Sequence, residues 1–196
     1  MLVRPRVIPS LLIQDGGLVK TKQFKKPEDV GDPINAGKIF NEKGVDELCI
    51  MDISEDRYSR GPDFSLLEEV ASEAFMPLAY GGGIRNLDDA KRIFRIGFEK
   101  MILNRVLAED EMLAGEIIRL FGSQSVIASI DIKKSLLGGY TVYTNSGKTI
   151  VSKNVSEWAK KVEKMGVGEI LLSNIDREGM QNGFDVGIIR KIADNA

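Results

Sequence analysis

The chain of 196 residues is 43% hydrophobic and 29% charged, with a net charge of −2, which is typical of one soluble globular protein that does not bind nucleic acid. With no histidine and one cysteine, zinc sites, histidine-dependent triads and a disulfide framework are excluded, and a reducing, cytoplasmic compartment is favoured. No apolar run approaches the roughly 18 residues of a membrane span, and no signal peptide is expected. We expect no metal and no cofactor, so acid–base chemistry falls to Asp, Glu, Lys or Tyr.

Six short apolar runs along the chain predict β-strands. Most of them lack the alternation of a strand with one solvated face, which favours a parallel sheet buried on both faces. The runs cover residues 6–13, 47–53, 77–80, 100–103, 125–132 and 169–173.

Amphipathic stretches between these runs predict helices with recognisable ends. Capping residues such as Asp32 and Asn86 stand at the starts, and glycines stand just past the ends. Two further segments differ: residues 139–151 predict an inserted hairpin, and residues 20–32 predict a long polar loop. The helices are expected at 32–44, 86–97, 155–166 and 185–194.

Six βα units in series fit either an open doubly wound sheet or a barrel. Residues 44–48 resemble residues 166–170, and this spacing of about 120 residues implies two halves of a (β/α)₈ barrel of about 250 residues. We therefore predict a TIM barrel with a two-fold half-barrel repeat, forming one domain over residues 1–196. It is truncated after about six βα units, so that strands seven and eight are missing.

A triple glycine follows the predicted strand 77–80. Gly82 and Gly83 let backbone N–H groups approach an anion, and the helix that Asn86 begins adds a favourable dipole. The alternative is a tight turn that needs positive φ. Asn104 and Arg105, in the next βα turn, are candidates to bind the same phosphate.

Carboxylates stand at the ends of three of the predicted strands. Asp52, Asp131 and Asp176 are candidate acids or bases, although loop amides could satisfy each of them instead. The polar run that contains Asp176 and Gly179 has too many polar groups to be only a connector. Lys20 begins the segment that suits a lid over an anionic substrate, or a plain solvated loop.

Four charged residues stand at strand starts and would meet at the amino-terminal face of a barrel. By itself this pattern favours a stability network. The four residues are Arg6, Glu47, Lys100 and Glu169.

Several segments in a fixed order resemble the cyclase subunit of imidazole glycerol phosphate synthase, HisF. The resemblance runs from end to end of the chain. It implies a half-repeated barrel that docks a glutaminase (HisH) on its amino-terminal face and passes ammonia to a phosphorylated small molecule at the other end. The matching segments are residues 6–9, 31–33, 46–48, 81–84, 121–126 and 168–172.

The resemblance also implies roles for single residues. Asp131 matches one of two catalytic aspartates, and Lys20 matches a lid lysine that contacts substrate. Arg105 stands where a threonine is more usual in the phosphate site. The ammonia gate corresponds to Arg6, Glu47, Lys100 and Glu169, and the phosphate and substrate positions to Gly82, Gly83, Asn104, Arg105, Asp52, Asp176 and Gly179.

The chain departs from the family pattern at Leu12, where the other catalytic aspartate is expected. Leucine cannot exchange a proton, so the two-carboxylate mechanism cannot run in its usual form. The departure resembles a paralogue branch associated with glycosyl amidation (WbuZ-like), in which ammonia serves the amidation of surface-polysaccharide sugars beside a sugar amidotransferase. Two alternatives stay open: a genuine cyclase (a lyase of histidine biosynthesis), and a non-catalytic ammonia conduit.

Overall fold

The computed structural model describes residues 4–135 and 138–194, which form two compact units. Unit 1 contains residues 4–19 and 29–102, and unit 2 contains residues 20–28, 103–135 and 138–194. The segment 20–28 therefore belongs with residues far along the chain, because it packs on the second unit.

The strands of unit 1 follow the order β3-β2-β1-β4-β5-β6 in the sheet. Neighbouring pairs from β1 to β6 are parallel, whereas β1 and β2 form an antiparallel hairpin. The bounds are β1 Ser10–Gln14, β2 Gly17–Lys22, β3 Lys25–Gly31, β4 Leu48–Asp52, β5 Leu78–Gly81 and β6 Lys100–Leu103, with β2, β3 and β6 each extending into unit 2.

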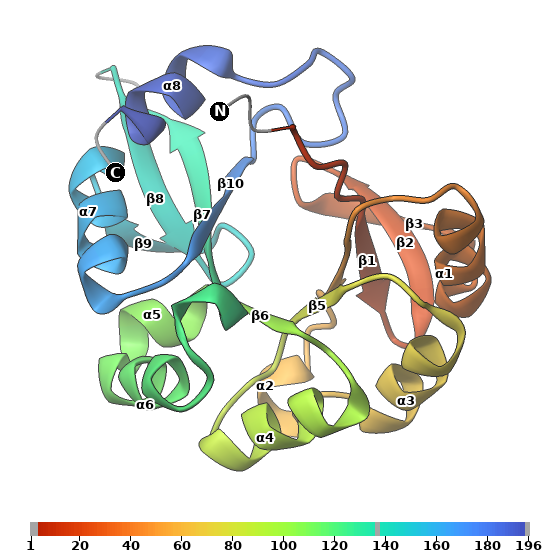
Figure 1. Ribbon diagram of the computed structural model, residues 1–196. Coiled ribbons are helices and arrows are strands. Elements are labelled where there is room, and N and C mark those ends of the chain that lie inside the picture. Colours follow the sequence, from red (N-terminus) through yellow and green to blue (C-terminus); the bar gives the residue numbers. More distant parts are fainter. Residues whose placement is uncertain (1–3, 136–137, 195–196) are drawn as a thin grey trace. The chain divides into compact units, whose positions relative to one another are not determined.

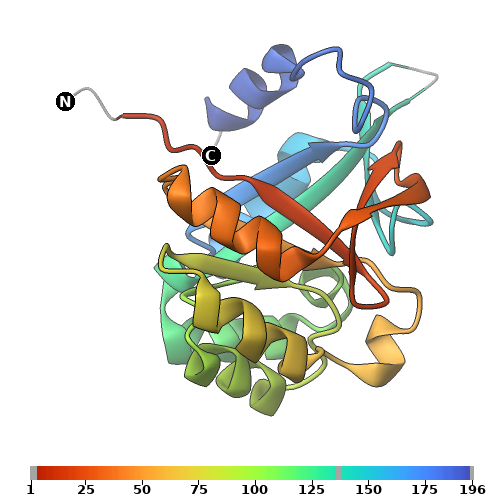
Figure 2. The same cartoon turned by 90° about the vertical axis from the view of Figure 1, so that its right-hand side faces the viewer.

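Three longer helices cover one face of these strands, and Figures 1 and 2 show them side by side. Two of them form where the sequence predicts caps: the side chain of Asp32 accepts the amide of Asn35, and that of Asn86 accepts the amide of Asp89. The third, which Asp63 caps, was not predicted. The helices are α1 Pro33–Glu42, α3 Phe64–Glu73 and α4 Leu87–Ile96, with a short α2 at Arg57–Arg60.

In unit 2 the strand order is β10-β7-β8-β9. β10 is parallel to β7, and β8 and β9 continue the sheet as an antiparallel hairpin in the segment where an insertion was predicted. The strands are β7 Val126–Lys134, β8 Tyr140–Thr144, β9 Thr149–Ser152 and β10 Glu169–Asn174. The helices are α5 Arg105–Glu109, α6 Glu111–Phe121, α7 Val155–Met165 and α8 Val186–Ala193, with a 3₁₀ turn at Ser123–Ser125.

Strand burial explains why the sequence lacks alternation. Every residue of β5 and the first seven residues of β7 are buried, as expected for parallel strands covered on both faces. All six predicted strands are present, and the parallel α/β class is confirmed.

The prediction of a polar loop at residues 20–32 is wrong, because most of this segment belongs to β2 and β3. All seven residues of β3 are exposed, so no apolar pattern marks the strand. β3 lies at an edge of the sheet, where charged residues and the proline at position 27 are tolerated.

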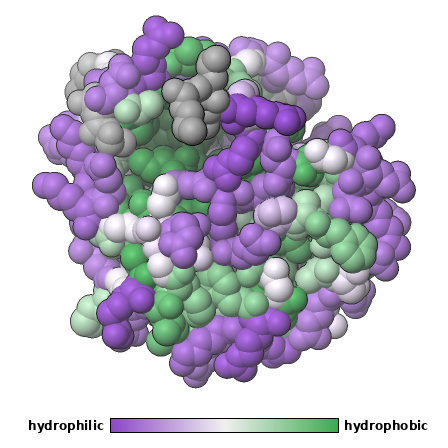
Figure 3. Space-filling model, viewed as in Figure 1, coloured by the Kyte–Doolittle hydropathy of each residue, from purple (hydrophilic) through white to green (hydrophobic). Residues whose placement is uncertain are grey.

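The surface in Figure 3 is mainly hydrophilic, with hydrophobic residues in smaller patches between the charged ones. Single exposed apolar side chains occur in both units, such as Phe75 and Phe184, at 81% and 86% exposure. Within the described part of the chain, no helix has the length and apolar character needed to cross a membrane.

Candidate functional site

Three of the four charged residues at strand starts form one cluster in unit 1. Glu47 Oε2 accepts hydrogen bonds from Lys100 Nζ at 2.6 Å and from Arg6 Nη1 at 3.1 Å. The side chain of Glu47 is 2% exposed, whereas that of Arg6 is 46% exposed. Its second oxygen, Oε1, is buried and has no hydrogen-bond partner among the described residues. The Glu47 carboxylate therefore pairs with two cations through one oxygen, and its other oxygen makes no hydrogen bond within the described residues.

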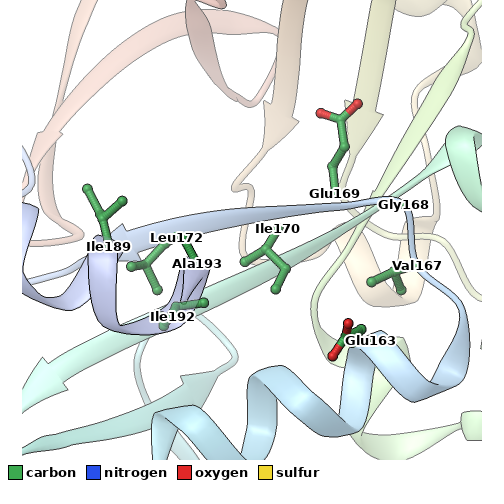
Figure 4. A pocket seen from close by; sticks show the side chains of 9 residues that line it. All are labelled: Glu163, Val167, Gly168, Glu169, Ile170, Leu172, Ile189, Ile192 and Ala193. Atoms are coloured by element: carbon green, nitrogen blue, oxygen red, sulfur yellow. The ribbon is translucent and has the colours of Figure 1, made fainter. Parts of the chain in front are cut away.

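Glu169, the fourth charged residue, begins β10 in unit 2. Figure 4 shows its carboxylate on the opposite side of β10 from Ile170. Ile170 and Leu172 line a hollow of about 420 Å³, together with Ile189 and Ile192 of α8. This hollow is mainly apolar, and apart from Glu169 it contains none of the predicted site residues.

The triple-glycine turn in unit 1 is closely packed by backbone. Gly82 and Gly83 have φ of +130° and +66°, which favour glycine. A Cβ at Gly82 would lie 2.7 Å from the Cβ of Asp52, and one at Gly83 would lie 2.5 Å from the carbonyl oxygen of Arg57. Positive φ and close packing therefore both require glycine here, whether or not the turn also binds an anion.

Asp52 lies at the carboxyl end of β4 with both oxygens engaged. Oδ1 accepts from the amide of Ser54 at 2.8 Å, and Oδ2 accepts from Arg60 Nη2 at 2.9 Å. Burial by itself lowers the pKa of the Arg60 guanidinium, but the hydrogen bond and charge of Asp52 raise it above its ordinary value. This pairing leaves Asp52 a satisfied buried carboxylate.

Asp131 and Asn104 lie together in unit 2. Asp131 is buried on β7, and Asn104 Nδ2 lies 3.3 Å from its Oδ2 and 3.0 Å from the carbonyl oxygen of Ser129. Arg105 begins α5 and pairs with Glu109 one turn later. Asp131 lies three residues before the end of β7, so it is not at the strand end that the sequence predicted. A buried carboxylate that accepts an amide N–H still has the arrangement expected of a positioned acid or base.

Leu12 is paired with Met51 in the parallel register of β1 and β4. Side chains in register on neighbouring strands lie on the same face of a sheet. Two apolar side chains therefore stand side by side where the family pattern expects one catalytic carboxylate.

The remaining predicted residues lie in unit 2, along the β2–β3 hairpin and the loop after β10. Lys20 faces Glu28 across the hairpin at 3.8 Å. Asp176 Oδ2 accepts from the amide of Lys134 at 2.8 Å. A Cβ at Gly179 would lie 2.2 Å from the carbonyl oxygen of Thr21, so this glycine permits close contact with the hairpin.

Sequence reasoning missed a polar cluster around Asp185. The hydroxyl of Tyr140 donates to Asp185 Oδ2, and Asn174 Nδ2 donates to the same oxygen at 3.0 Å. The bond from Tyr140 lowers the pKa of the Asp185 carboxyl, and it raises the pKa of the Tyr140 hydroxyl. The only sequence signal was the place of Asp185 at the start of a helix.

Comparison with known proteins covers nearly the whole chain. A family model described as "Histidine biosynthesis protein" matches residues 6–196. A protein of Pseudomonas aeruginosa, named as a candidate imidazole glycerol phosphate synthase subunit hisF2, is 50% identical over 99% of this chain and 77% of its own length.

Two further relatives carry related names. A candidate imidazole glycerol phosphate synthase subunit HisF of Leptospira borgpetersenii is 44% identical over 97% of this chain and 76% of its own length. The imidazole glycerol phosphate synthase subunit HisF of Geobacillus thermodenitrificans is 39% identical over 98% of this chain and 77% of its own length.

Proposed function

Because the chain belongs to the histidine biosynthesis protein family, and within it to the HisF family of imidazole glycerol phosphate synthase subunits, we propose that it receives ammonia from a glutaminase of the HisH type. The ammonia passes through the barrel and serves the amidation of a surface-polysaccharide sugar, beside a sugar amidotransferase. The relatives named as hisF2 and hisF3 support a paralogue rather than the histidine-pathway protein itself.

The observation that carries this proposal is Leu12. Ring closure in the cyclase needs two carboxylates to move protons, and here Leu12 stands beside Met51. Loss of one general acid or base lowers a rate by about 10²–10⁴-fold. A chain selected for ring closure would not keep this substitution, whereas a chain that delivers ammonia tolerates it.

Charged residues stand at all four positions of the proposed ammonia entrance. We propose that Glu47, Lys100 and Arg6, with Glu169, form the ammonia entrance on the face that docks the glutaminase. The buried Glu47 carboxylate with one unused oxygen supports this role, because it offers an acceptor to ammonia.

The other end of the barrel would bind the phosphorylated acceptor. Gly82, Gly83, Asn104 and Arg105 would hold its phosphate, with Asp52, Asp176 and Gly179 around the substrate. Asp131 would act as the remaining acid or base, because it is buried and accepts the Asn104 amide. Lys20 would close over the anionic group from the β2–β3 hairpin.

A genuine cyclase is the second candidate, and Asp131 is the observation that favours it. A conduit without chemistry of its own would have no use for a buried carboxylate held by an amide within β7. The cyclase and the amidation subunit differ in whether the ring-closed product forms.

Growth of a histidine auxotroph that lacks its cyclase separates these candidates. We expect no rescue by the protein when it is co-expressed with its glutaminase. Rescue would contradict the amidation proposal. The Leu12→Asp variant is the matched test, since it restores the second carboxylate, and rescue by this variant alone would show that Leu12 is the main barrier.

A further inference from the structure

The turn between β2 and β3 is strained. Gln23 and Phe24, its two residues, have φ of +54° and +59°. This geometry suits the twist of a two-residue hairpin, but it normally takes Asn or Gly because other side chains crowd the backbone. Such a conformation persists only when surrounding contacts hold it.

The contacts that hold this turn come from the loop after β10, within unit 2. The amide of Gln23 donates to the carbonyl oxygen of Glu178 at 3.0 Å, and the amide of Phe24 donates to Glu178 Oε2 at 2.9 Å. Thr21 Oγ1 donates to Glu178 Oε1 at 2.8 Å. The side chain of Gln23 adds a bond to the carbonyl oxygen of Asp176 at 3.1 Å.

Glu178 is therefore the centre of the contact. Its two carboxylate oxygens and its carbonyl oxygen each accept one bond from the hairpin, and two of the three donors are the amides of the strained turn. Carboxylate acceptors make stronger hydrogen bonds than neutral ones. The next residue, Gly179, has φ of +69° and lies against Thr21 so closely that a Cβ would collide with the backbone.

We infer that Glu178 is a positioning residue that latches the β2–β3 hairpin onto the loop after β10, and so sets where Lys20 lies. Lys20 directly precedes Thr21 on β2, so release of the Thr21 bond and of the strained turn frees the strand that carries the lysine. The role of Lys20 rests on the proposed function, but the latch itself does not.

Hydrogen–deuterium exchange of the Gln23 and Phe24 amides tests the latch without any substrate. In Glu178→Gln one carboxylate acceptor is lost while the side-chain shape is kept. We expect the Phe24 amide to exchange about tenfold faster, because a bond to a charged acceptor is lost. Thr21→Val removes the hydroxyl that donates to Glu178 Oε1. It should raise the exchange rates of the same amides by a smaller factor. Glu178→Asp keeps the negative charge, so its turn amides should exchange more slowly than those of Glu178→Gln.

The control is Glu116→Gln, the same change at an exposed carboxylate of α6. It should leave both turn amides unchanged. The amides of β7 should exchange at the wild-type rate in every variant. Turn amides that exchange equally fast in wild type and Glu178→Gln would overturn the inference, and so would a gain in exchange shared by β7. Neither outcome depends on the auxotroph result, so failure of the latch and failure of the proposed function are distinguishable.

Discussion

Replacement of Lys100 by methionine is the change that the charge cluster of unit 1 makes most consequential. Lys100 is 14% exposed and makes the shorter of the two bonds to Glu47 Oε2, whose side chain is 2% exposed. Methionine keeps most of the side-chain length of lysine. It leaves the buried Glu47 carboxylate with the longer bond from the more exposed Arg6. Breaking one side of a buried ion pair costs about 3–5 kcal/mol, and the remaining bond from Arg6 brings the expected loss to about 3 kcal/mol.

Arg6→Met is the matched control in the same cluster. Arg6 is 46% exposed and its bond to Glu47 is 3.1 Å long, so its loss should cost about 1 kcal/mol or less. The double variant Lys100→Met with Glu47→Leu removes both buried charges and should recover most of the stability that Lys100→Met loses.

Urea unfolding followed by far-ultraviolet circular dichroism measures these differences, with Glu47→Leu alone completing the cycle. The reasoning would be refuted if Lys100→Met and Arg6→Met had equal, small effects. It would also be refuted if the double variant were as unstable as the sum of the two single changes, since no coupling would then exist.

Three further changes have defined outcomes. Tyr140→Phe should cost about 1 kcal/mol near neutral pH. Because the folded state lowers the pKa of Asp185 and raises that of Tyr140, this difference should shrink as pH falls below 3.8 or rises above 10.0 in stability curves. Gly83→Ala should destabilise by about 3 kcal/mol in urea unfolding, because it adds a Cβ at positive φ against the carbonyl of Arg57; a loss below 1 kcal/mol would mean that the turn relaxes easily. Asn154→Ala removes the side-chain cap of α7 and should lower stability by about 1 kcal/mol in thermal melts, whereas no change would show that other contacts fix this helix end.

The parallel strands and capped helices were predictable because their signals are local. A strand buried on both faces is mainly apolar, and β4, β5 and β7 follow that rule apart from the buried Asp52, Ser129 and Asp131. Asp32 and Asn86 begin helices because short polar side chains accept the first free amides. The β2–β3 hairpin was missed because its strands are polar and its turn lacks the usual Asn or Gly.

The polar contacts of unit 2 could not be predicted, since they join residues far apart with no motif between them. Tyr140 and Asp185 are 45 residues apart, and Phe24 and Glu178 are 154 residues apart. The loss of a carboxylate at Leu12 can be recognised only by comparison with the family pattern, because a leucine is an ordinary residue in an apolar strand. The charge cluster could be predicted in part. The sequence showed which charged residues stand at the strand starts, but it did not show that Glu47 is buried.

The proposed function requires that the protein takes up ammonia without closing an imidazole ring. The most direct measurement combines the protein, its glutaminase, glutamine and the phosphorylated aminoimidazole precursor of the cyclase reaction, and follows glutamate and ring-closed product together. We predict that the protein stimulates glutamine hydrolysis while no ring-closed product accumulates. Ring-closed product formed in step with glutamate would contradict the account.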